Sequence, residues 1–329
     1  MKFDIIRQQV FTSLVTLFVM SLVGVFALLM GVHSSLGLVA NESLLGGYIV
    51  DFQHDHLTWS AIISSAMIFI SAVRLGRVVS TQNLFEVSTS IQLPLIGVMM
   101  WCVTLGADFL LSATVVTLSA IIVREFLLAM RNTNYLPNLF NAALALSLLP
   151  LIYTPAAMMW ITVPFILLWV GVTLREWIVG VVGLLLPVAI VSYIFWLCGA
   201  ELLLPVESMA AMFVEWSALA DISGLMLFRS LIVAVALLLT LLSMVWVKNA
   251  LYKNRRRMHI TLITILFALS TLVTPSATLL SFALLAPPLA ITTAYAAVNL
   301  RGRVANILYF TFLALLLLSM FTPLYLPLL

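Results

Sequence analysis

The sequence predicts an all-α integral membrane protein, a polytopic bundle of about eleven transmembrane helices. Hydrophobic residues make up 64% of the 329 residues and charged residues only 8%, whereas a soluble domain carries about a quarter charged residues. The mean hydropathy is +1.22. Such a chain cannot cover its own surface with polar groups, so lipid is its expected solvent. The apolar runs have the length of helices, which pair their own backbone groups in lipid.

We expect a single integral membrane domain over residues 1–329, because no polar stretch is long enough to fold separately. The formal net charge is +3 and the pI is near 9.0. The basic residues are spread over one side of the expected membrane, so nucleic acid is not an expected partner. Cys102 and Cys198 both fall inside predicted spans, which argues against a disulfide framework.

The first predicted helix is the apolar run at 10–32, which is too long for a signal-peptide core and is interpreted as a retained span. Residues 33–57 form the first of two long outer loops. Six further spans are then expected, with approximate limits of 58–73, 88–106, Asp108 to 123, 138–153, Pro155 to Arg175, and 177–198.

Residues 199–223 form the second long outer loop. Pro205 is expected to start a short helix in this loop, lying in the membrane interface on one apolar face. That face would consist of Val206, Met209, Phe213 and Trp216. The last spans are expected at 224–247, 259–273, the stretch up to 300, and 304–324. The two segments between 259 and 300 either cross fully or form a re-entrant pair, and both arrangements return the chain to the same side.

The distribution of positive charge predicts the topology. Fourteen of the fifteen Lys and Arg residues fall on one side: Lys2, Arg7, Arg74, Arg77, Arg124, Arg131, Arg175, Lys248, Lys253, Arg255, Arg256, Arg257, Arg301 and Arg303. Because positive charge is retained in the cytoplasm, the N-terminus is predicted to be cytoplasmic and the C-terminus periplasmic. The basic run at 253–257 is expected to lie in a cytoplasmic loop, where it fixes the topology and contacts anionic lipid.

The most polar stretch is Asp51-Phe52-Gln53-His54-Asp55-His56, in the first outer loop. Its two carboxylates and two imidazoles can supply a general base or ligands for a divalent cation. Asp51, His54, Asp55 and His56 are therefore the candidate catalytic residues. The alternative is an ordinary solvated loop in which Asp55 or Thr58 caps the next helix. His54 and His56 alone do not define a metal site, because two ligands are too few.

Arg229 is the one basic residue inside a predicted span, about 9 Å below its outer end at 1.5 Å per residue. A charge at this depth needs a partner or a polar cavity. Arg229 could bind the phosphate of a lipid-linked substrate in the outer leaflet. Alternatively, it extends to the interface and pairs with Asp221 or Asp108. Asp108 is a candidate for the same substrate site or, more simply, an N-cap in a tight outer turn.

Five hydroxyl residues surround the turn near Pro275: Thr271, Thr274, Ser276, Thr278 and Ser281. They either line a polar cavity or bond back to carbonyl groups of their own helix. These two interpretations predict different functions, because a polar cavity is what a transporter needs.

Two resemblances add expectations. Through Leu148-Leu149-Pro150-Leu151-Ile152-Tyr153 with Pro155, then Leu174-Arg175-Glu176-Trp177, Gly183 and Pro187, residues 137–199 resemble an uncharacterised family of bacterial multipass inner-membrane proteins of unknown function. That resemblance implies a bacterial inner membrane, and it implies no known activity. The layout of a first span, an acidic outer loop and many further spans is similar to membrane glycosyltransferases that use polyprenyl-phosphate sugars. This resemblance implies a carboxylate at the reaction centre, matching Asp51 or Asp55, although this chain lacks their large outer domain.

Three functions are therefore expected, in order. The first is a transferase acting on a polyprenyl-phosphate-linked substrate at the outer leaflet, with a divalent cation as one option for its cofactor. The second is a lipid or small-molecule transporter. The third is a non-catalytic subunit of a membrane complex, which suits short loops and few polar residues within the spans.

Overall fold

The computed structural model describes residues 10–30, 43–85, 89–105, 108–130, 135–170, 173–211, 224–247, 252–274, 278, 280–300 and 302–325. Almost all of these residues lie in thirteen α-helices and two 3-10 helices, and no strand occurs among them. The predicted all-α class is confirmed.

The first half of the chain forms α1 (Val10–Leu29), α2 (Gly46–Asp55), α3 (Leu57–Thr81), α4 (Gln92–Thr104), α5 (Phe109–Ala129) and α6 (Leu136–Ile152). A 3-10 segment, η2 (Thr154–Ile161), leads into the second half. That half forms α7 (Thr162–Val170), α8 (Leu174–Leu197), α9 (Leu204–Ala211), α10 (Gly224–Val247), α11 (Tyr252–Ser270), the 3-10 turn η3 (Thr271–Val273), α12 (Leu280–Asn299) and α13 (Gly302–Tyr325).

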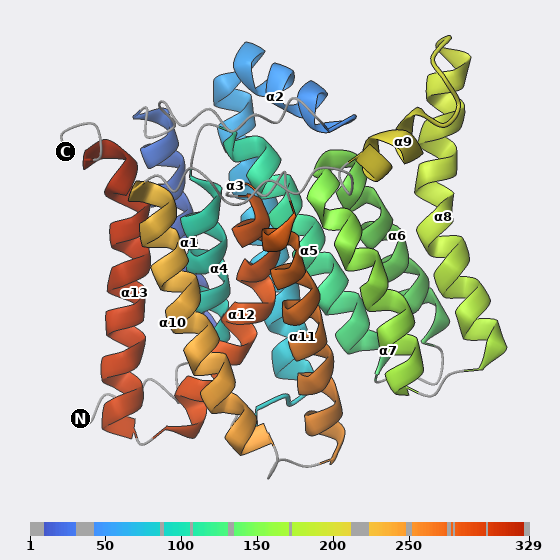
Figure 1. Cartoon of the computed structure of the whole chain (residues 1–329). Coiled ribbons are helices and arrows are strands. Elements are labelled where there is room, and N and C mark those ends of the chain that lie inside the picture. Colours follow the sequence, from blue (N-terminus) through green and yellow to red (C-terminus); the bar gives the residue numbers. More distant parts are fainter. Residues whose placement is uncertain are drawn as a thin grey trace.

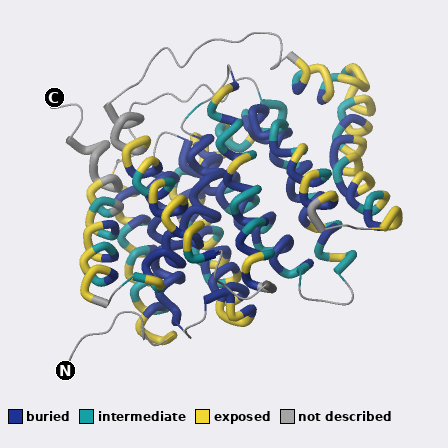
Figure 2. The backbone as a smooth tube through the Cα atoms, turned by 60° about the horizontal axis from the view of Figure 1, so that its bottom comes forward, coloured by how far each residue is buried: buried dark blue, intermediate teal, exposed yellow. Residues whose placement is uncertain are grey.

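The long helices lie side by side in one bundle, and α2 and α9 lie at the same end of it (Figure 1). α12 is the central helix, with 94% of its most apolar stretch buried inside the bundle. It packs on α4, α5, α10 and α11. α8 is at the edge of the bundle, and only 33% of its most apolar stretch is buried. Figure 2 shows its exposed residues along the rim. α8 is apolar around most of its circumference, as expected for a helix whose outer side meets lipid.

Seven helices are long and apolar enough to cross a membrane, so the fold is compatible with a multipass membrane protein. They are Val10–Leu29, Leu57–Thr81, Phe109–Ala129, Leu174–Leu197, Ser230–Val247, Asn254–Val273 and Leu280–Asn299. Shorter apolar helices cover Gln92–Thr104, Leu136–Ile152, Thr154–Leu168 and Arg303–Leu315. The span count of about eleven and the sidedness of the termini stay predictions.

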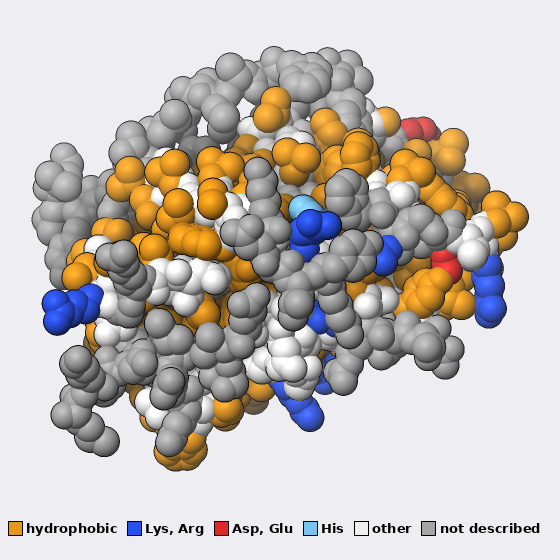
Figure 3. Space-filling model, turned by 90° about the horizontal axis from the view of Figure 1, so that it is seen from below, with side chains coloured by type: hydrophobic (Ala, Val, Ile, Leu, Met, Phe, Trp, Pro, Cys, Tyr) orange, Lys and Arg blue, Asp and Glu red, His pale blue; other side chains and the backbone are white. Residues whose placement is uncertain are grey.

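Charged side chains separate to the two ends of the bundle. We call the end that carries α2 and α9 the acidic face; its described charged residues include Asp51, Asp55, Asp108, Glu201 and Glu207. The opposite end is the basic face, seen in Figure 3 with its Lys and Arg side chains in blue. Its described basic residues include Arg74, Arg77, Arg124, Arg175, Arg255, Arg256, Arg257 and Arg303.

Helix limits at the basic face differ from the predicted ones. α3 continues to Thr81, well past the predicted end at 73, because Leu75, Val78 and Val79 are buried while Arg74 and Arg77 are exposed. α11 already begins at Tyr252, so the run 253–257 lies in a helix and not in the predicted loop. Basic residues therefore do not end these helices, since a helix can carry charge on its outward side.

The two long outer loops both contain helices. Pro205 lies in the first turn of α9, as predicted. Of the expected apolar face, Met209 is buried and Val206 is exposed, and Phe213 and Trp216 lie outside the described residues. The interfacial face therefore stays a prediction. α2 was not predicted at all, and it carries the Asp/His stretch.

Candidate functional site

α2 is anchored at its first turn by close contact with α6. The Leu45 N–H donates to the Leu151 carbonyl at 2.9 Å. Gly46 follows, and a Cβ added there would lie 2.7 Å from the Ile152 carbonyl oxygen. Only glycine fits this approach, since real Cβ atoms do not come so near to backbone. The sequence Gly46-Gly47 therefore starts a helix here and does not merely break a loop.

The other end of α2 is attached to α5 by Gln53. Its side chain is 1% exposed, and its Oε1 accepts a hydrogen bond from the Leu110 N–H at 2.8 Å. Leu110 is the second residue of α5, so Gln53 satisfies one of the backbone donors that a helix start leaves open. Asp108 occupies the N-cap position of α5 but makes no capping hydrogen bond through its side chain. The predicted capping role of Asp108 is wrong, because a residue distant in sequence does this work.

Asp108 is instead a buried carboxyl beneath α2. It is 4% exposed, and its Oδ2 has no hydrogen-bond partner among the described residues. Asp108 precedes the span of α5 and so lies at the acidic face. Burial raises the pKa of the Asp108 carboxyl above its ordinary value, and the nearby charge of His54 partly offsets this rise. A buried carboxyl within electrostatic range of an imidazole is a candidate for proton-transfer chemistry.

The four predicted catalytic residues lie on or directly after α2, and all of them are exposed: Asp51, His54, Asp55 and His56. The structure brings one of them, His54, within electrostatic range of Asp108. The His56 ring packs edge-on against Phe52 with centroids 5.2 Å apart. The alternative capping interpretation is wrong, because His56 is the N-cap of α3 and no side chain caps that helix.

A protein-only metal site is not found in the described part of the chain, where no three His, Cys, Asp or Glu residues come together. Asp51 and Asp55 are one helical turn apart on α2, so they can share a cation only together with oxygens from a ligand or water. Arg229 lies in the second turn of α10. Its side chain and Asp221 fall outside the described residues, so both interpretations of Arg229 stay predictions.

Most of the described hydroxyl groups near the α11–α12 turn form hydrogen bonds within the protein and do not line a polar cavity. Thr271 donates to the Ala268 carbonyl and Thr274 to the Thr271 carbonyl, both at 2.7 Å. Ser281 is 2.7 Å from the hydroxyl of Tyr153, which also accepts from the Thr278 N–H. Ser276 lies outside the described residues. Hydroxyls satisfied in this way hold helices together and are not available to a solute.

The sequence does not reveal two positions that hold the elements around the site together. Gln53 was read as one more polar residue of the Asp/His stretch, and Tyr153 as the end of a span. No local signal separates them from their neighbours, because both act on residues far along the chain. The burial of Gln53 could be predicted only after α2 is recognised as a helix, because its neighbours on that turn are exposed.

No protein-family model matches the chain, and no curated protein or solved structure is similar to it. The resemblances drawn from its motifs therefore stay expectations.

Proposed function

We propose that this chain is a transferase of the bacterial inner membrane that acts on a polyprenyl-phosphate-linked substrate at the outer leaflet. It would cross the membrane about eleven times, with the N-terminus in the cytoplasm and the C-terminus in the periplasm. The observation that carries the proposal is the Asp108 carboxyl, which is buried under α2 within electrostatic range of His54 and whose Oδ2 has no hydrogen-bond partner among the described residues. Keeping such a group is costly for the fold, and costly polar groups concentrate at functional sites.

The chemistry of group transfer from a lipid phosphate fits these residues. An acceptor hydroxyl must lose a proton as it attacks, and the leaving phosphate must be stabilised. His54 is exposed and acts as the base in this proposal, while the Asp108 carboxylate, within electrostatic range, would favour the protonated imidazole. Arg229 would bind the departing phosphate as a charge-assisted partner. Asp51 and Asp55 would contact the acceptor or, with the substrate phosphate, a divalent cation.

The separation of charge supports the orientation. The described arginines gather at the basic face and most described acids at the acidic face. Two acids at the basic face have local partners there: Glu125 pairs with Arg124, and Glu176 completes a capping box with Thr173. If positive charge is retained in the cytoplasm, α2 would lie in the periplasm.

The test is to profile lipid-linked sugars in cells carrying Asp108→Asn or His54→Gln as the only copy. Each should lower turnover on the order of 10²-fold or more, the usual contribution of a proton-transfer group, and the lipid-linked substrate should accumulate. Asp51→Asn, Asp55→Asn and Arg229→Gln complete the series. Glu207→Gln, an exposed acid of α9 on the same face, is the matched control. Unchanged profiles for both Asp108→Asn and His54→Gln, at normal protein level, would contradict the proposal.

The packing of α12 favours the non-catalytic subunit as a second candidate over the transporter. Its hydroxyls are held by other helices: Ser281 by Tyr153 and Thr292 by Thr240, each at 2.7 Å. Polar groups of the core that are hydrogen-bonded to one another stabilise the packing of the helices and do not form a path for a solute. Under this second proposal, Asp108→Asn would leave the sugar profile unchanged while Gln53→Ala, which loosens α2, would release a bound partner on purification.

A further inference from the structure

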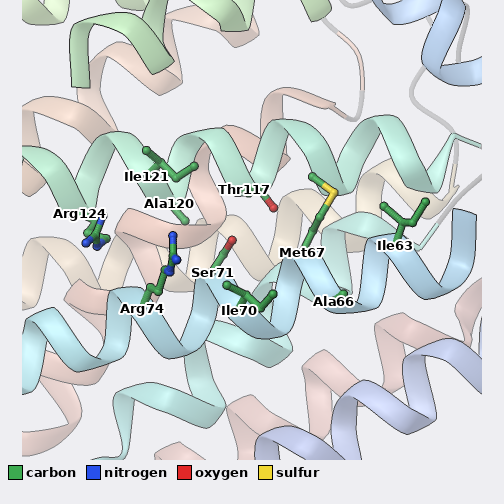
Figure 4. A pocket seen from close by; sticks show the side chains of 10 residues that line it. All are labelled: Ile63, Ala66, Met67, Ile70, Ser71, Arg74, Thr117, Ala120, Ile121 and Arg124. Carbon is green, nitrogen blue, oxygen red and sulfur yellow. The ribbon is translucent and has the colours of Figure 1, made fainter. Parts of the chain in front are cut away.

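A groove of about 300 Å³ lies between α3 and α5 and is separate from the acidic-face site. Figure 4 shows it running along both helices, with the two arginines at one end and Ile63 at the other. Its apolar lining consists of Ile63, Ala66, Met67, Ile70, Ala120 and Ile121. Arg74 of α3 and Arg124 of α5 line the same groove where it reaches the basic face.

The groove has the length of one membrane leaflet. Ile63 and Arg74 are eleven residues apart on one helix, which is about 16 Å at 1.5 Å per residue. Half of the hydrocarbon core of a bilayer is about 15 Å. The apolar part is therefore as long as one leaflet is thick, which would place the arginines where lipid headgroups begin.

The charge at the arginine end matches a single anion. Arg124 forms an ion pair with the buried carboxylate of Glu125, and Arg74 interacts electrostatically with that same carboxylate. Two guanidinium groups and one carboxylate leave one net positive charge. Arg74 is exposed, so its N–H donors are accessible to a ligand. Guanidinium groups bind phosphate oxygens in pairs, which makes them stronger phosphate ligands than a point charge.

We propose that this groove binds a phospholipid whose headgroup carries a net charge of minus one, taken from the leaflet at the basic face. One acyl chain would lie along Met67 and Ile70, and the phosphate would bind between Arg74 and Arg124. The site differs from the transferase site in leaflet, helix ends and ligand, and it does not depend on the proposed activity. The competing account is that these arginines meet bulk headgroups without selection, as basic residues at an interface commonly do.

The experiment uses the full-length protein in detergent micelles and native mass spectrometry to count bound lipid. Phosphatidylglycerol should bind saturably, and phosphatidylcholine with the same acyl chains should not. Arg74→Gln should weaken phosphatidylglycerol binding about fivefold, the loss expected for one basic residue near an anionic headgroup. Arg74→Gln leaves the Arg124–Glu125 pair intact, so the fold is preserved. Arg77→Gln is the matched control, because Arg77 is exposed on the same helix and does not line the groove.

A second pair of variants tests the apolar part. Ala66→Trp puts an indole into the groove from an exposed position and should displace the lipid. Ile62→Trp, at an exposed neighbouring position outside the groove, should have no effect. Equal weakening by Arg74→Gln and Arg77→Gln would overturn the proposal, and so would full binding to Ala66→Trp. Competition by inorganic phosphate at the same concentration as the lipid would assign the site to a free anion and overturn it as well.

Discussion

The two faces of the bundle hold their charged groups in opposite ways. At the acidic face the Asp108 carboxyl is buried, and its Oδ2 has no hydrogen-bond partner in the part of the chain that the structure describes. At the basic face Arg74 is exposed, Arg124 pairs with Glu125, and the buried Arg257 donates to a backbone carbonyl. Charges at the basic face are thus solvated or bonded, which is what topology and lipid contact require. The Asp108 carboxyl is instead buried beneath the helix that carries the Asp/His stretch, and a buried carboxyl in such a position is a candidate functional group.

The largest expected effect concerns Arg257, the one fully buried arginine among the described residues. It is 2% exposed, and its Nη1 donates to the Gln82 carbonyl at 2.7 Å. Arg257→Met keeps much of the volume but leaves that carbonyl unsatisfied, so we expect a loss of about 2–3 kcal/mol in the free energy of unfolding. Arg255→Met, at an exposed position of the same run, should change it by less than about 0.5 kcal/mol. Equal losses would show that burial does not distinguish these arginines.

The next effect concerns the anchor of α2. Gly46→Ala brings a Cβ to 2.7 Å from the Ile152 carbonyl oxygen, so we expect a loss of about 1–3 kcal/mol and faster hydrogen exchange throughout α2. Gly47→Ala meets nothing within 4 Å and should stabilise the helix by about 0.5–1 kcal/mol. Hydrogen exchange measured by mass spectrometry separates the two. If both variants behave alike, α2 is not held in the way described.

The third effect is a pH dependence at Asp108. Because burial raises the pKa of this carboxyl in the folded state, its contribution to stability is fully present below the ordinary value of 3.8. That contribution is lost as the pH rises through the raised pKa. Asp108→Asn removes the charge, so it should be more stable than wild type by about 1 kcal/mol at neutral pH, and this advantage should disappear on acidification.

Thermal unfolding in detergent at several pH values measures this difference. Asp51→Asn is the control, because Asp51 is exposed and the substitution should change stability by less than about 0.5 kcal/mol. An Asp108→Asn variant that is less stable than wild type at neutral pH would mean that the carboxylate is structurally required. Greater stability combined with lost activity would identify Asp108 as a functional group kept at the expense of the fold.

The sequence predicts the helices of this fold well, because long apolar runs such as those of α1, α8 and α10 leave no other structure in lipid. It does not predict α2, since a ten-residue helix with mixed polar and apolar residues has no clear period. The sequence also points to the Asp/His stretch as a candidate site. It does not show that the buried polar residues there are Gln53, within the stretch, and Asp108, at the start of α5. Those roles depend on contacts with α5 that arise only when the chain folds. Likewise, the sequence indicates only that Arg74 and Arg124 each mark one side of the membrane. It does not show that the two arginines line one groove.

The central claim is that the acidic and basic faces lie on opposite sides of a membrane, with α2 in the outer compartment. The native Cys198, exposed at the end of α8 on the acidic face, allows a direct measurement with a membrane-impermeant maleimide on intact spheroplasts. Cys198 should be labelled before permeabilisation. A cysteine introduced as Arg77→Cys, in a chain carrying Cys198→Ser, should be labelled only afterwards. Labelling in the reverse order, or of both positions from one side, would contradict the account.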